Sequence, residues 1–448
     1  MNNNIPHYDL VGVGVGPFNL SLAALLEPHR AGGENLKALF LERKQKFEWH
    51  PGVILPGTTL QVPFLADLTS LVDPTSPYTF LNYLHHQGRL YKFYFYENFK
   101  VFRKEYSHYC RWVAEQLETV EFSKEVKKIE AVGDEFLVTY LDTSRGEHET
   151  VRASNLVLGY GTQPYVPEVA REFLGDNVFH TSAFRPFKHR FLQAKDITIV
   201  GSGQSAAECF QHVLNERGHE KYRMNWFTRG EGFLPMEYSK LGLEHFSPEY
   251  INYFYDLPEK VRDRIRSGQD LWYKGISGDT IGEIFDILYE LDLEEEKPDI
   301  GLTARVELRG VKRLGTNELE LTLFHRDEEI ELRHKTDILL LGTGYYQGQP
   351  KFLENLSTLL ETDSSNRFQV SRDYKLLRKD KQGGTIYVQN GEIHSHGIGA
   401  PDLGLGAYRS ASIINSLLGK DIYKLFQKNV FQSFGTEALR KMSYQEVR

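Results

Sequence analysis

The chain has 448 residues, about three times the usual length of one domain, so two or three domains are expected. Hydrophobic residues make up 40% and charged residues 25%, which excludes a disordered or fibrous chain. The net charge of −8, with no basic block, argues against nucleic acid as the main partner. The two cysteines, Cys110 and Cys209, are too few for a disulfide framework or a Cys-rich metal site.

The sequence carries no pattern typical of export or of a membrane. Its first ten residues are polar and lead directly into a predicted strand, so no signal peptide is expected. Apolar runs stay shorter than the roughly 18 residues needed to span a bilayer. We therefore expect a soluble, cytoplasmic protein.

The N-terminal half alternates predicted strands and helices. Tyr8–Val15 is a short apolar strand, and a helix follows over Asn19–Leu26. A loop-rich aromatic stretch covers 47–112 and contains two segments with helical spacing. The predicted elements of this half are strands at 37–41, 120–131, 135–140 and 155–159 and helices at 79–87 and 104–117.

The second half begins with another strand, glycine loop and helix. The strand starts at Asp196, and its helix runs to about Leu214. The elements predicted after it are strands at 222–228, 305–313, 318–325 and 336–341, a mainly helical stretch over 250–289, and an amphipathic helical tail over 411–431.

The first glycine loop lies between a strand and a helix, in the sequence Gly12-Val13-Gly14-Val15-Gly16-Pro17. Glycines allow a tight turn there and let backbone N–H groups approach a pyrophosphate, while the helix N-terminus supplies positive potential. Pro17 suits the first helical turn. Glu42 ends the next strand, where an acid binds ribose hydroxyls. The pattern predicts a dinucleotide site rather than a structural glycine turn.

The second loop, Gly201-Ser202-Gly203-Gln204-Ser205-Ala206, has the same context, but its following strand ends in Arg229 and not in an acid. An arginine at that position favours a 2′-phosphate and therefore NADPH. The alternative is a solvated surface arginine.

One nucleotide-binding fold inserted in another is the plan of a flavoprotein in which NADPH reduces FAD. We expect an α/β fold with two nested Rossmann-like dinucleotide-binding domains and a small, mainly helical substrate region. The expected division is 1–190 for the first part of the FAD domain, 191–335 for the NADPH domain with a helical insert at about 235–300, and 336–448 for the second part of the FAD domain with C-terminal helices.

Five segments together carry a resemblance to a known family. They are GVGVGPFNLSLA, ERKQKFEWH, LQVPFLADLTSLVDPTSPYTFLNYL, VGSGQSAAE and LLLGTGY. In this order they resemble the N-hydroxylating flavin monooxygenases of siderophore synthesis, which act on ornithine, lysine, putrescine or cadaverine. The likeness runs from about Tyr8 to Leu418 and implies FAD, NADPH and O₂, hydroxylation through a C4a-hydroperoxyflavin, and a homotetramer or dimer.

The resemblance also implies roles for particular residues. Trp49 and His50 are expected at the flavin, although an aromatic loop that packs on the sheet is the alternative. The residues implied at FAD are Gly12, Gly14, Gly16, Pro17, Glu42, Arg43, Lys44, Trp49, His50, Gln61, Val126, Pro401, Asp402 and Leu403. Those implied at NADPH are Gly201, Ser202, Gly203, Gln204, Ser205, Arg229, Lys274, Gly275 and Ile276. Gln61 and Gln204 are predicted to organise the polar contacts of catalysis.

The sequence departs from the amino-acid-hydroxylating members at several positions. They have a lysine in the motif FLKDL that pairs with the substrate carboxylate, whereas this chain has Ala66 there. Leu243 replaces the Asn of an Asn-Glu pair, Gly404 replaces a serine, and Lys274-Gly275 replaces Asn-Tyr. A buried carboxylate without its partner costs several kcal/mol, on the order of 3–5. The departures therefore predict a diamine, putrescine or cadaverine.

The second ammonium of a diamine needs a counter-charge, and Asp402 and Glu244 are the candidates. Asp402 could equally cap a turn. The alternative substrates are L-lysine, hydroxylated at N6, and L-ornithine, hydroxylated at N5, if another cation replaces the missing lysine. His394 and His396 suggest a metal site, but no third ligand accompanies them, so no metal is expected.

Overall fold

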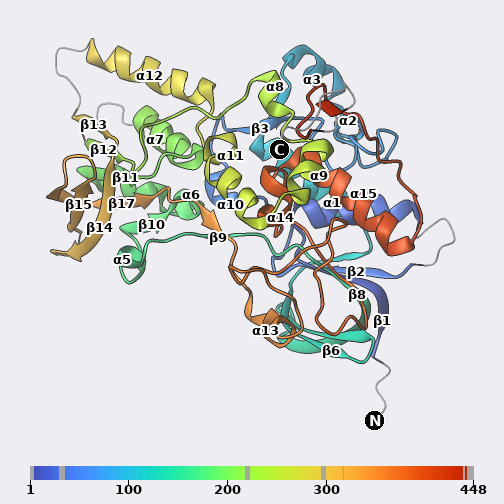
Figure 1. Cartoon of the computed structure of the whole chain (residues 1–448). Coiled ribbons are helices and arrows are strands. Elements are labelled where there is room, and N and C mark those ends of the chain that lie inside the picture. Colours follow the sequence, from blue (N-terminus) through green and yellow to red (C-terminus); the bar gives the residue numbers. More distant parts are fainter. Residues whose placement is uncertain are drawn as a thin grey trace.

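The computed structural model describes residues 5–29, 36–216, 222–293, 299–315, 317–436 and 439–440. The chain forms two lobes, each built on a sheet with parallel strands, and a group of short helices lies beside them (Figure 1). The helices are α1 (Pro17–His29), α2 (Phe80–His86), α3 (Leu90–Tyr96), α4 (Arg103–Ala114), α5 (Glu168–Arg171), α6 (Phe184–Phe187), α7 (Gln204–Glu216), α8 (Lys240–Leu243), α9 (Pro248–Asp256), α10 (Glu259–Ser267), α11 (Asp270–Tyr273), α12 (Gly278–Asp292), α13 (Glu354–Ser357), α14 (Ile393–His396) and α15 (Gly406–Leu418).

The first sheet is held together by the long strand β8. The second half of β8 pairs in parallel with β1 and β19, and its first half pairs antiparallel with β7. The strands are β1 (His7–Val13), β2 (Ala38–Leu41), β5 (Val120–Glu121), β6 (Lys124–Val132), β7 (Glu135–Asp142), β8 (Glu147–Leu158) and β19 (Ile386–Val388). Their order is β5-β2-β1-β8-β7-β6. The predicted pairing of 120–131 with 135–140 is confirmed by the antiparallel pair β6 and β7.

The second sheet is parallel throughout and holds the second glycine loop. Its order is β10-β17-β11-β12-β13. The strands are β10 (Val178–His180), β11 (Asp196–Val200), β12 (Arg223–Phe227), β13 (Ile300–Thr303) and β17 (Ile338–Leu341). A separate antiparallel sheet, β14 (Val306–Arg313), β15 (Leu319–His325) and β16 (Ile330–Thr336), packs on it. These strands confirm the elements predicted at 305–313 and 318–325.

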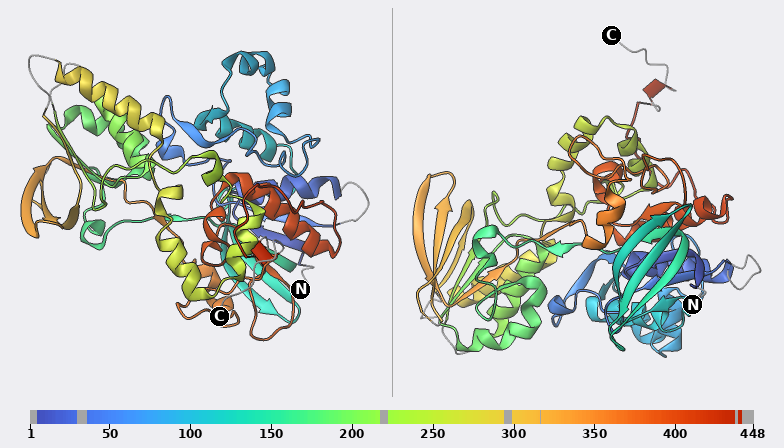
Figure 2. Two further views of the ribbon diagram at one scale, coloured as in Figure 1. Left: turned by 45° about the horizontal axis from the view of Figure 1, so that its top comes forward. Right: turned by 90° about the horizontal axis from the view of Figure 1, so that it is seen from below.

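The parallel strands of both sheets are buried on their two faces, which is why these strands are apolar runs. In β1, Leu10 packs on α1, α4 and α15, whereas Val11 and Val13 pack on the opposite face with β7 and α13. In the second sheet Ile197 and Ile199 pack on α7 and α12. Figure 2 shows α12 along one side of this lobe.

The structure differs from the prediction at three places. The strand predicted at 120–131 is divided into β5 and β6, and β5 pairs with β2. The strand at 336–341, predicted to begin the returning first domain, lies in the second sheet between β10 and β11, because an apolar run does not state which sheet it joins. The tail helix predicted to reach residue 431 ends at Leu418, because Gly419 has φ of 64° and closes α15 in a left-handed cap. Residues 419–436 contain no further helix among those described.

Two chain crossovers connect the lobes, and they pair with each other. The segment between β8 and β10 contains β9 (Gln163–Pro164), and the segment between β17 and β19 contains β18 (Tyr345–Tyr346). β9 and β18 form an antiparallel pair. The Tyr165 N–H also donates to the Gly344 carbonyl at 2.9 Å. The crossovers therefore form one two-stranded ribbon between the sheets.

Candidate functional site

A cavity of about 2450 Å³ lies between the two sheets. Pockets for one small ligand have volumes of about 300–1,000 Å³, so this cavity has room for more than one. Both glycine loops line it, one from each lobe. The cavity lies at the carboxyl ends of the parallel strands, where ligands bind in open α/β sheets.

The first glycine loop has the backbone that a pyrophosphate cradle requires. Gly14 has φ of +84°, and a Cβ there would lie 2.7 Å from the Gly159 carbonyl oxygen, so no other residue fits. No described atom lies within 4 Å of the Cβ position of Gly16, which lines the cavity with Pro17. Gly12 has another role: a Cβ there would lie 2.2 Å from the Phe40 ring, and the residue lies outside the cavity lining.

Glu42 connects the end of β2 to this loop. Its carboxylate accepts hydrogen bonds from the Val15 N–H at 2.8 Å and the Lys44 N–H at 3.0 Å. Asn19 on α1 donates to the Gly14 carbonyl at 2.7 Å and so fixes the loop from the other side. Glu42, Arg43 and Lys44 all line the cavity. These hydrogen bonds hold the loop in its conformation from both sides.

The loop after β2 and a bulge in β6 complete this wall of the cavity. Trp49 and His50 line it, and their rings contact each other at 4.9 Å between centroids. Burial and the positive charges of Arg103 and Lys44 lower the pKa of His50 to about 4, so its imidazole is neutral at pH 7. The pairing of β6 with β7 shifts after Val126, which brings the Val126 backbone to the cavity.

The backbone of the second glycine loop is in close contact with the residue after β17, just as the backbone of the first loop is in close contact with the residue after β8. A Cβ on Gly201, whose φ is +122°, would lie 2.1 Å from the Gly342 carbonyl oxygen. Ser202, at the following position, accepts a hydrogen bond from the Thr228 hydroxyl at 2.8 Å. All five positions from Gly201 to Ser205 line the cavity. The Gly201 N–H donates to the Phe227 carbonyl at 2.8 Å, and the residues after it lead into the N-terminus of α7, a 13-residue helix suited to a phosphate.

Arg229 lies at the end of β12, as predicted, and is exposed at the cavity wall. Its guanidinium has no hydrogen bond or ion pair with any other residue that the structure describes. The neighbouring arginines differ, because Arg305 pairs with Asp327 at 3.1 Å and Arg326 with Glu307 at 3.5 Å. The N–H groups of the Arg229 guanidinium are thus free to bind a ligand at the cavity wall.

Gln204 lines the cavity, but its amide already has protein partners. Its Nε2 donates to Glu208 at 2.8 Å and to Thr280 at 3.1 Å, and its Oε1 accepts from the Ser277 N–H at 2.7 Å. These bonds connect α7 to the start of α12. The predicted catalytic role of Gln204 stays a prediction, and it would require the amide to exchange one of these partners.

The segment after α11 divides into cavity and core residues. Lys274 and Gly275 line the cavity. A Cβ on Gly275 would lie 2.5 Å from the Met236 nitrogen, so the two segments are in close backbone contact. Ile276 is fully buried in the core of the second lobe and lies outside the lining, so its side chain packs the scaffold.

Three residues predicted at the substrate lie together. The Cβ position of Gly404 is 2.9 Å from an Asp402 carboxylate oxygen and 3.8 Å from the Ala66 methyl group. Pro401 and Leu403, which flank Asp402, line the large cavity. Asp402, Gly404 and Ala66 lie outside the cavity lining themselves and form a cluster directly behind Pro401 and Leu403. The cluster contains one carboxylate and two small residues, and Ala66 stands where the amino-acid-hydroxylating relatives have a lysine.

The carboxyl of Asp402 is the ionisable group of this cluster. Burial raises its pKa to about 6, and the nearby N–H groups of Gly404 and Leu405 and the charge of Arg409 only partly oppose that rise. It is ionised at pH 7 and costs free energy there until a cation pairs with it. Asp67 is different, since its carboxylate accepts N–H groups of Thr69, Ser70 and Phe80 and holds its own loop.

Glu244 already has a partner in the C-terminal tail. The Glu244 carboxylate accepts the backbone N–H groups of Phe431 and Gln432, both at 2.9 Å, so it binds the C-terminal tail. These hydrogen bonds lower its pKa. Leu243 ends α8 and, like Glu244, lies outside the cavity lining. Gln61 on β3 (Thr59–Pro63) is half-buried and also outside it. The roles predicted for these three residues stay predictions.

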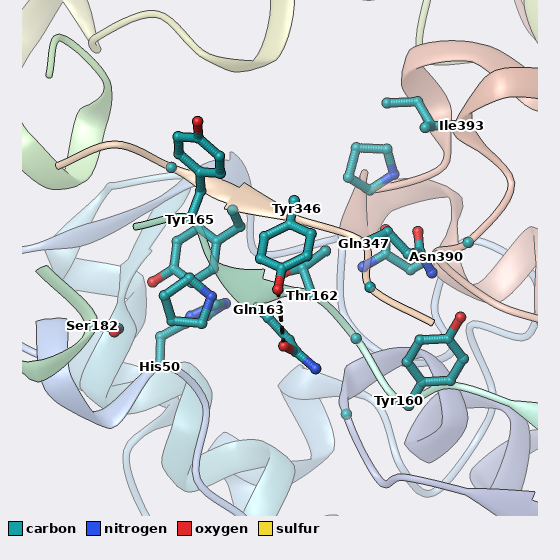
Figure 3. Close-up of a pocket in the computed structure, with 18 of the residues that line it drawn as sticks. His50, Tyr160, Thr162, Gln163, Tyr165, Ser182, Tyr346, Gln347, Asn390 and Ile393 are labelled. Atoms are coloured by element: carbon teal, nitrogen blue, oxygen red, sulfur yellow. Dashed lines mark hydrogen bonds between the residues drawn. The ribbon is translucent and has the colours of Figure 1, made fainter. Parts of the chain in front are cut away.

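The crossover residues line the cavity as well, although no sequence motif marks them. Figure 3 shows Tyr160, Tyr165, Tyr346 and His50 around one space, with Gln163 and Gln347 among them. The Tyr346 hydroxyl donates to Gln163 at 3.4 Å. The spacing of these aromatic residues along the sequence does not predict a site, because they come together only through the pairing of β9 with β18.

The two histidines considered as metal ligands bond to backbone carbonyls. His394 Nε2 lies 2.9 Å from the Phe368 oxygen, and His396 Nε2 lies 3.4 Å from the Arg372 oxygen. Within the described ranges, no three His, Cys, Asp or Glu side chains gather as a metal site would require. Likewise, none of the described helices is long and apolar enough to cross a membrane.

Comparison with known proteins assigns the chain's relatives. Residues 6–347 match the family model described as L-lysine 6-monooxygenase/L-ornithine 5-monooxygenase. The chain is 43% identical over 436 residues to the rhizobactin siderophore biosynthesis protein RhbE of Rhizobium meliloti, covering 96% of this chain and 95% of the relative. It is 38% identical over 429 residues to the putrescine N-hydroxylase of Shewanella oneidensis, covering 95% and 84%.

A solved structure has the same architecture. The crystal structure of DfoA bound to FAD, the cadaverine monooxygenase of the desferrioxamine pathway in Erwinia amylovora, superposes with a TM-score of 0.91. The two chains are 37% identical, and the match covers 97% of this chain and 99% of DfoA.

Proposed function

The chain belongs to the L-lysine 6-monooxygenase/L-ornithine 5-monooxygenase family, and we propose that it hydroxylates one primary amine of an aliphatic diamine, putrescine or cadaverine. FAD and NADPH are the proposed cofactors and O₂ the co-substrate. The product would enter hydroxamate siderophore synthesis, the role in which the relative RhbE is named. Since NADPH is a cytoplasmic reductant, we place the reaction in the cytoplasm. Like other family members, the enzyme would act as a homo-oligomer, a dimer or a tetramer.

The first lobe fits FAD. The Gly14 backbone, the open space at Gly16 and the N-terminus of α1 form an anion cradle, and Glu42 lies where ribose hydroxyls would bind. When bound, the flavin would take hydride from NADPH and activate O₂ for transfer to an amine. Trp49, His50 and the crossover tyrosines would surround it and exclude water.

The second lobe fits NADPH. The N-terminus of α7 would hold the pyrophosphate, and Arg229 with Ser202 would bind the 2′-phosphate. Arg229 supports this assignment because it lines the cavity without a protein partner.

The cluster of Ala66, Asp402 and Gly404 is the observation that carries the substrate assignment. A substrate carboxylate near Asp402 would meet a like charge, and Ala66 offers it no cation. A diamine instead presents an ammonium to Asp402. The other amine of the diamine would lie away from Asp402, where burial without a counter-charge lowers its pKa and favours the neutral form needed to attack oxygen.

The test is a comparison of putrescine, cadaverine, L-lysine and L-ornithine with the purified holoenzyme, measuring hydroxylamine formed per NADPH oxidised. We expect close coupling with at least one diamine and poor coupling with both amino acids. The pocket geometry does not separate putrescine from cadaverine, since one methylene is worth only about 1 kcal/mol. Preference for lysine would contradict the substrate assignment and leave the cofactor assignment standing.

A further inference from the structure

Helix α3 and the residues after it expose several aromatic side chains. The structure describes every residue of α3, and none is buried. Tyr91 is 79% exposed and Phe95 73%, and their rings stack one helical turn apart. Tyr94 and Phe99 extend the same surface. Exposed apolar patches of this kind mark interaction surfaces in proteins. We call these four residues the α3 patch.

Helix α12 carries a second aromatic surface with the same spacing. Phe285 is 66% exposed and Tyr289 63%, at positions i and i+4 of one helical face. Leu293, which follows the last turn, continues the row at i+8. The opposite face of the helix packs on α7 through Ile284. We call Phe285, Tyr289 and Leu293 the α12 patch.

The two patches carry opposite charge. Residues 89–104, which include α3, hold five basic residues and one acidic residue. Three of the five, Arg89, Lys100 and Arg103, pair with acids of the same chain, whereas Lys92 and Lys104 have no ion pair with a residue that the structure describes. Helix α12 has no Lys or Arg, and its acids are Asp279, Glu283, Asp286, Glu290 and Asp292. Lys92 follows Tyr91 directly, and Asp286 follows Phe285 directly. Neither Lys92 nor Asp286 has an ion pair with another residue that the structure describes. Each patch thus has an aromatic pair and an unpaired charge, of opposite sign.

The patches lie at the same end of the molecule, the upper end in Figure 1. They flank an ion pair between Lys100 and Asp279 at 2.9 Å, which joins the segment after α3 to the first turn of α12. Within one chain, therefore, a basic aromatic surface and an acidic aromatic one lie at the same end of the molecule. A twofold axis between them would place each patch opposite the other patch of a second copy.

We propose that two copies of this chain associate through these surfaces, with the α3 patch of each copy packed on the α12 patch of the other. The proposal rests on the self-association proposed above and identifies where it occurs. Burial of the aromatic pairs drives the contact, and Lys92 with Asp286 of the second copy sets its register. The glycine loops and the Asp402 cluster stay outside the contact, since none of their residues belongs to either patch.

The experiment measures molar mass by sedimentation equilibrium of the FAD-loaded enzyme across a range of protein concentrations. The wild type is expected to exceed the 51.7 kDa of one chain at micromolar concentration. Lys92→Glu and Asp286→Lys are each expected to weaken the association at least tenfold. A chain with both substitutions restores the opposite charges across the interface and is expected to recover most of the wild-type mass.

Two double variants test the patches, one variant for each patch. Tyr91→Ser/Phe95→Ser and Phe285→Ser/Tyr289→Ser are both expected to give monomers that keep their FAD content and NADPH oxidation. The matched control is Ile330→Ser/Leu332→Ser, which removes exposed apolar side chains from β16 and is expected to keep the mass.

Three results would overturn the proposal: a monomeric wild type, a mass unchanged by either aromatic variant, or no recovery in the charge-swapped chain. Dissociation by the α3 variant alone would overturn the pairing of α3 with α12. Amine hydroxylation is assayed separately on the same samples, so a failure of the interface is distinguished from a failure of the proposed reaction.

Discussion

Arg103 on α4 and Glu208 on α7 form a bidentate ion pair between the two lobes. The two nitrogen–oxygen distances are 2.6 and 2.8 Å, and both side chains are buried. Burial raises the pKa of Glu208, and the charge of Arg103 opposes that rise. Glu208 also accepts the Gln204 amide, so the pair extends into the second glycine loop. The lobes are therefore joined by charge as well as by the crossovers.

Arg103→Met is expected to lower the free energy of unfolding by about 3–5 kcal/mol at pH 8, since it leaves Glu208 buried without its cation. The loss should shrink as the pH falls, because an unpaired Glu208 takes up a proton. Arg333→Met is the control: it breaks the exposed Arg333–Glu320 pair and should cost about 1 kcal/mol or less. Urea unfolding measures both, and equal losses would contradict the role of the buried pair.

Gly14→Ala is expected to abolish FAD binding, because the new Cβ has no space against the Gly159 carbonyl and φ is positive. Gly57→Ala separates the two causes, since Gly57 has φ of +80° but no described atom within 4 Å of its Cβ position. The control variant should lose only about 1 kcal/mol of stability and keep its flavin. The flavin absorbance of purified protein gives the answer, and a flavin-loaded Gly14→Ala enzyme would argue against the cradle.

Arg229→Ala should raise the KM for NADPH at least tenfold and leave the KM for NADH and for the diamine nearly unchanged. The reason is the loss of a charge-assisted contact to the 2′-phosphate, which NADH lacks. Arg326→Ala is a suitable comparison, because Arg326 pairs with Glu307. Steady-state oxidation of both nucleotides measures the effect. Equal increases for NADPH and NADH would show that Arg229 does not read the phosphate.

Asp402→Asn should raise the KM for the diamine at least tenfold without lowering stability at pH 8. Because burial raises the pKa of Asp402 from 3.8 to about 6, the folded state loses stability as the pH rises through that interval. The neutral amide removes this cost. In the wild type, the KM for the diamine should rise below about pH 6, where Asp402 is protonated.

Glu244→Gln is the matched acid-to-amide control for Asp402, since Glu244 binds the tail. Thermal unfolding and KM at several pH values test both variants. A diamine KM that changed with Glu244 and not with Asp402 would reverse the assignment of the counter-charge.

Ala66→Lys should weaken diamine turnover, because its ammonium would pair with Asp402 and repel the substrate ammonium. Ala66→Met supplies similar bulk without charge and separates the two effects. If both variants lose activity with putrescine equally, volume and not charge limits the site. The ratio of lysine to putrescine turnover should rise only in Ala66→Lys.

The sequence predicted the parts of the site that depend on local backbone. Gly14, Gly201, Glu42 and Arg229 follow strands, so their positions at the carboxyl ends of the sheets came from strand pattern and spacing. Arg103 could not be predicted, because its partner Glu208 lies 105 residues away and its role exists only once the lobes meet.

Other differences have similar physical reasons. Glu244 has the charge expected of a substrate ligand, but the tail supplies two N–H groups that bind it first. Ile276 follows two cavity residues, yet its apolar side chain turns into the core. The local sequence pattern predicts which residues are buried and which are exposed. It does not predict which distant residue will form a hydrogen bond or ion pair with a polar side chain.

The pairing of β9 with β18 has a mechanical consequence. Two unpaired linkers would restrain the relative rotation of the lobes only weakly. The hydrogen bonds between β9 and β18 couple the two crossovers, so one cannot be displaced without the other. Because the same ribbon carries Gln163 and Tyr346 into the cavity, a change in the angle between the lobes would also displace these two side chains.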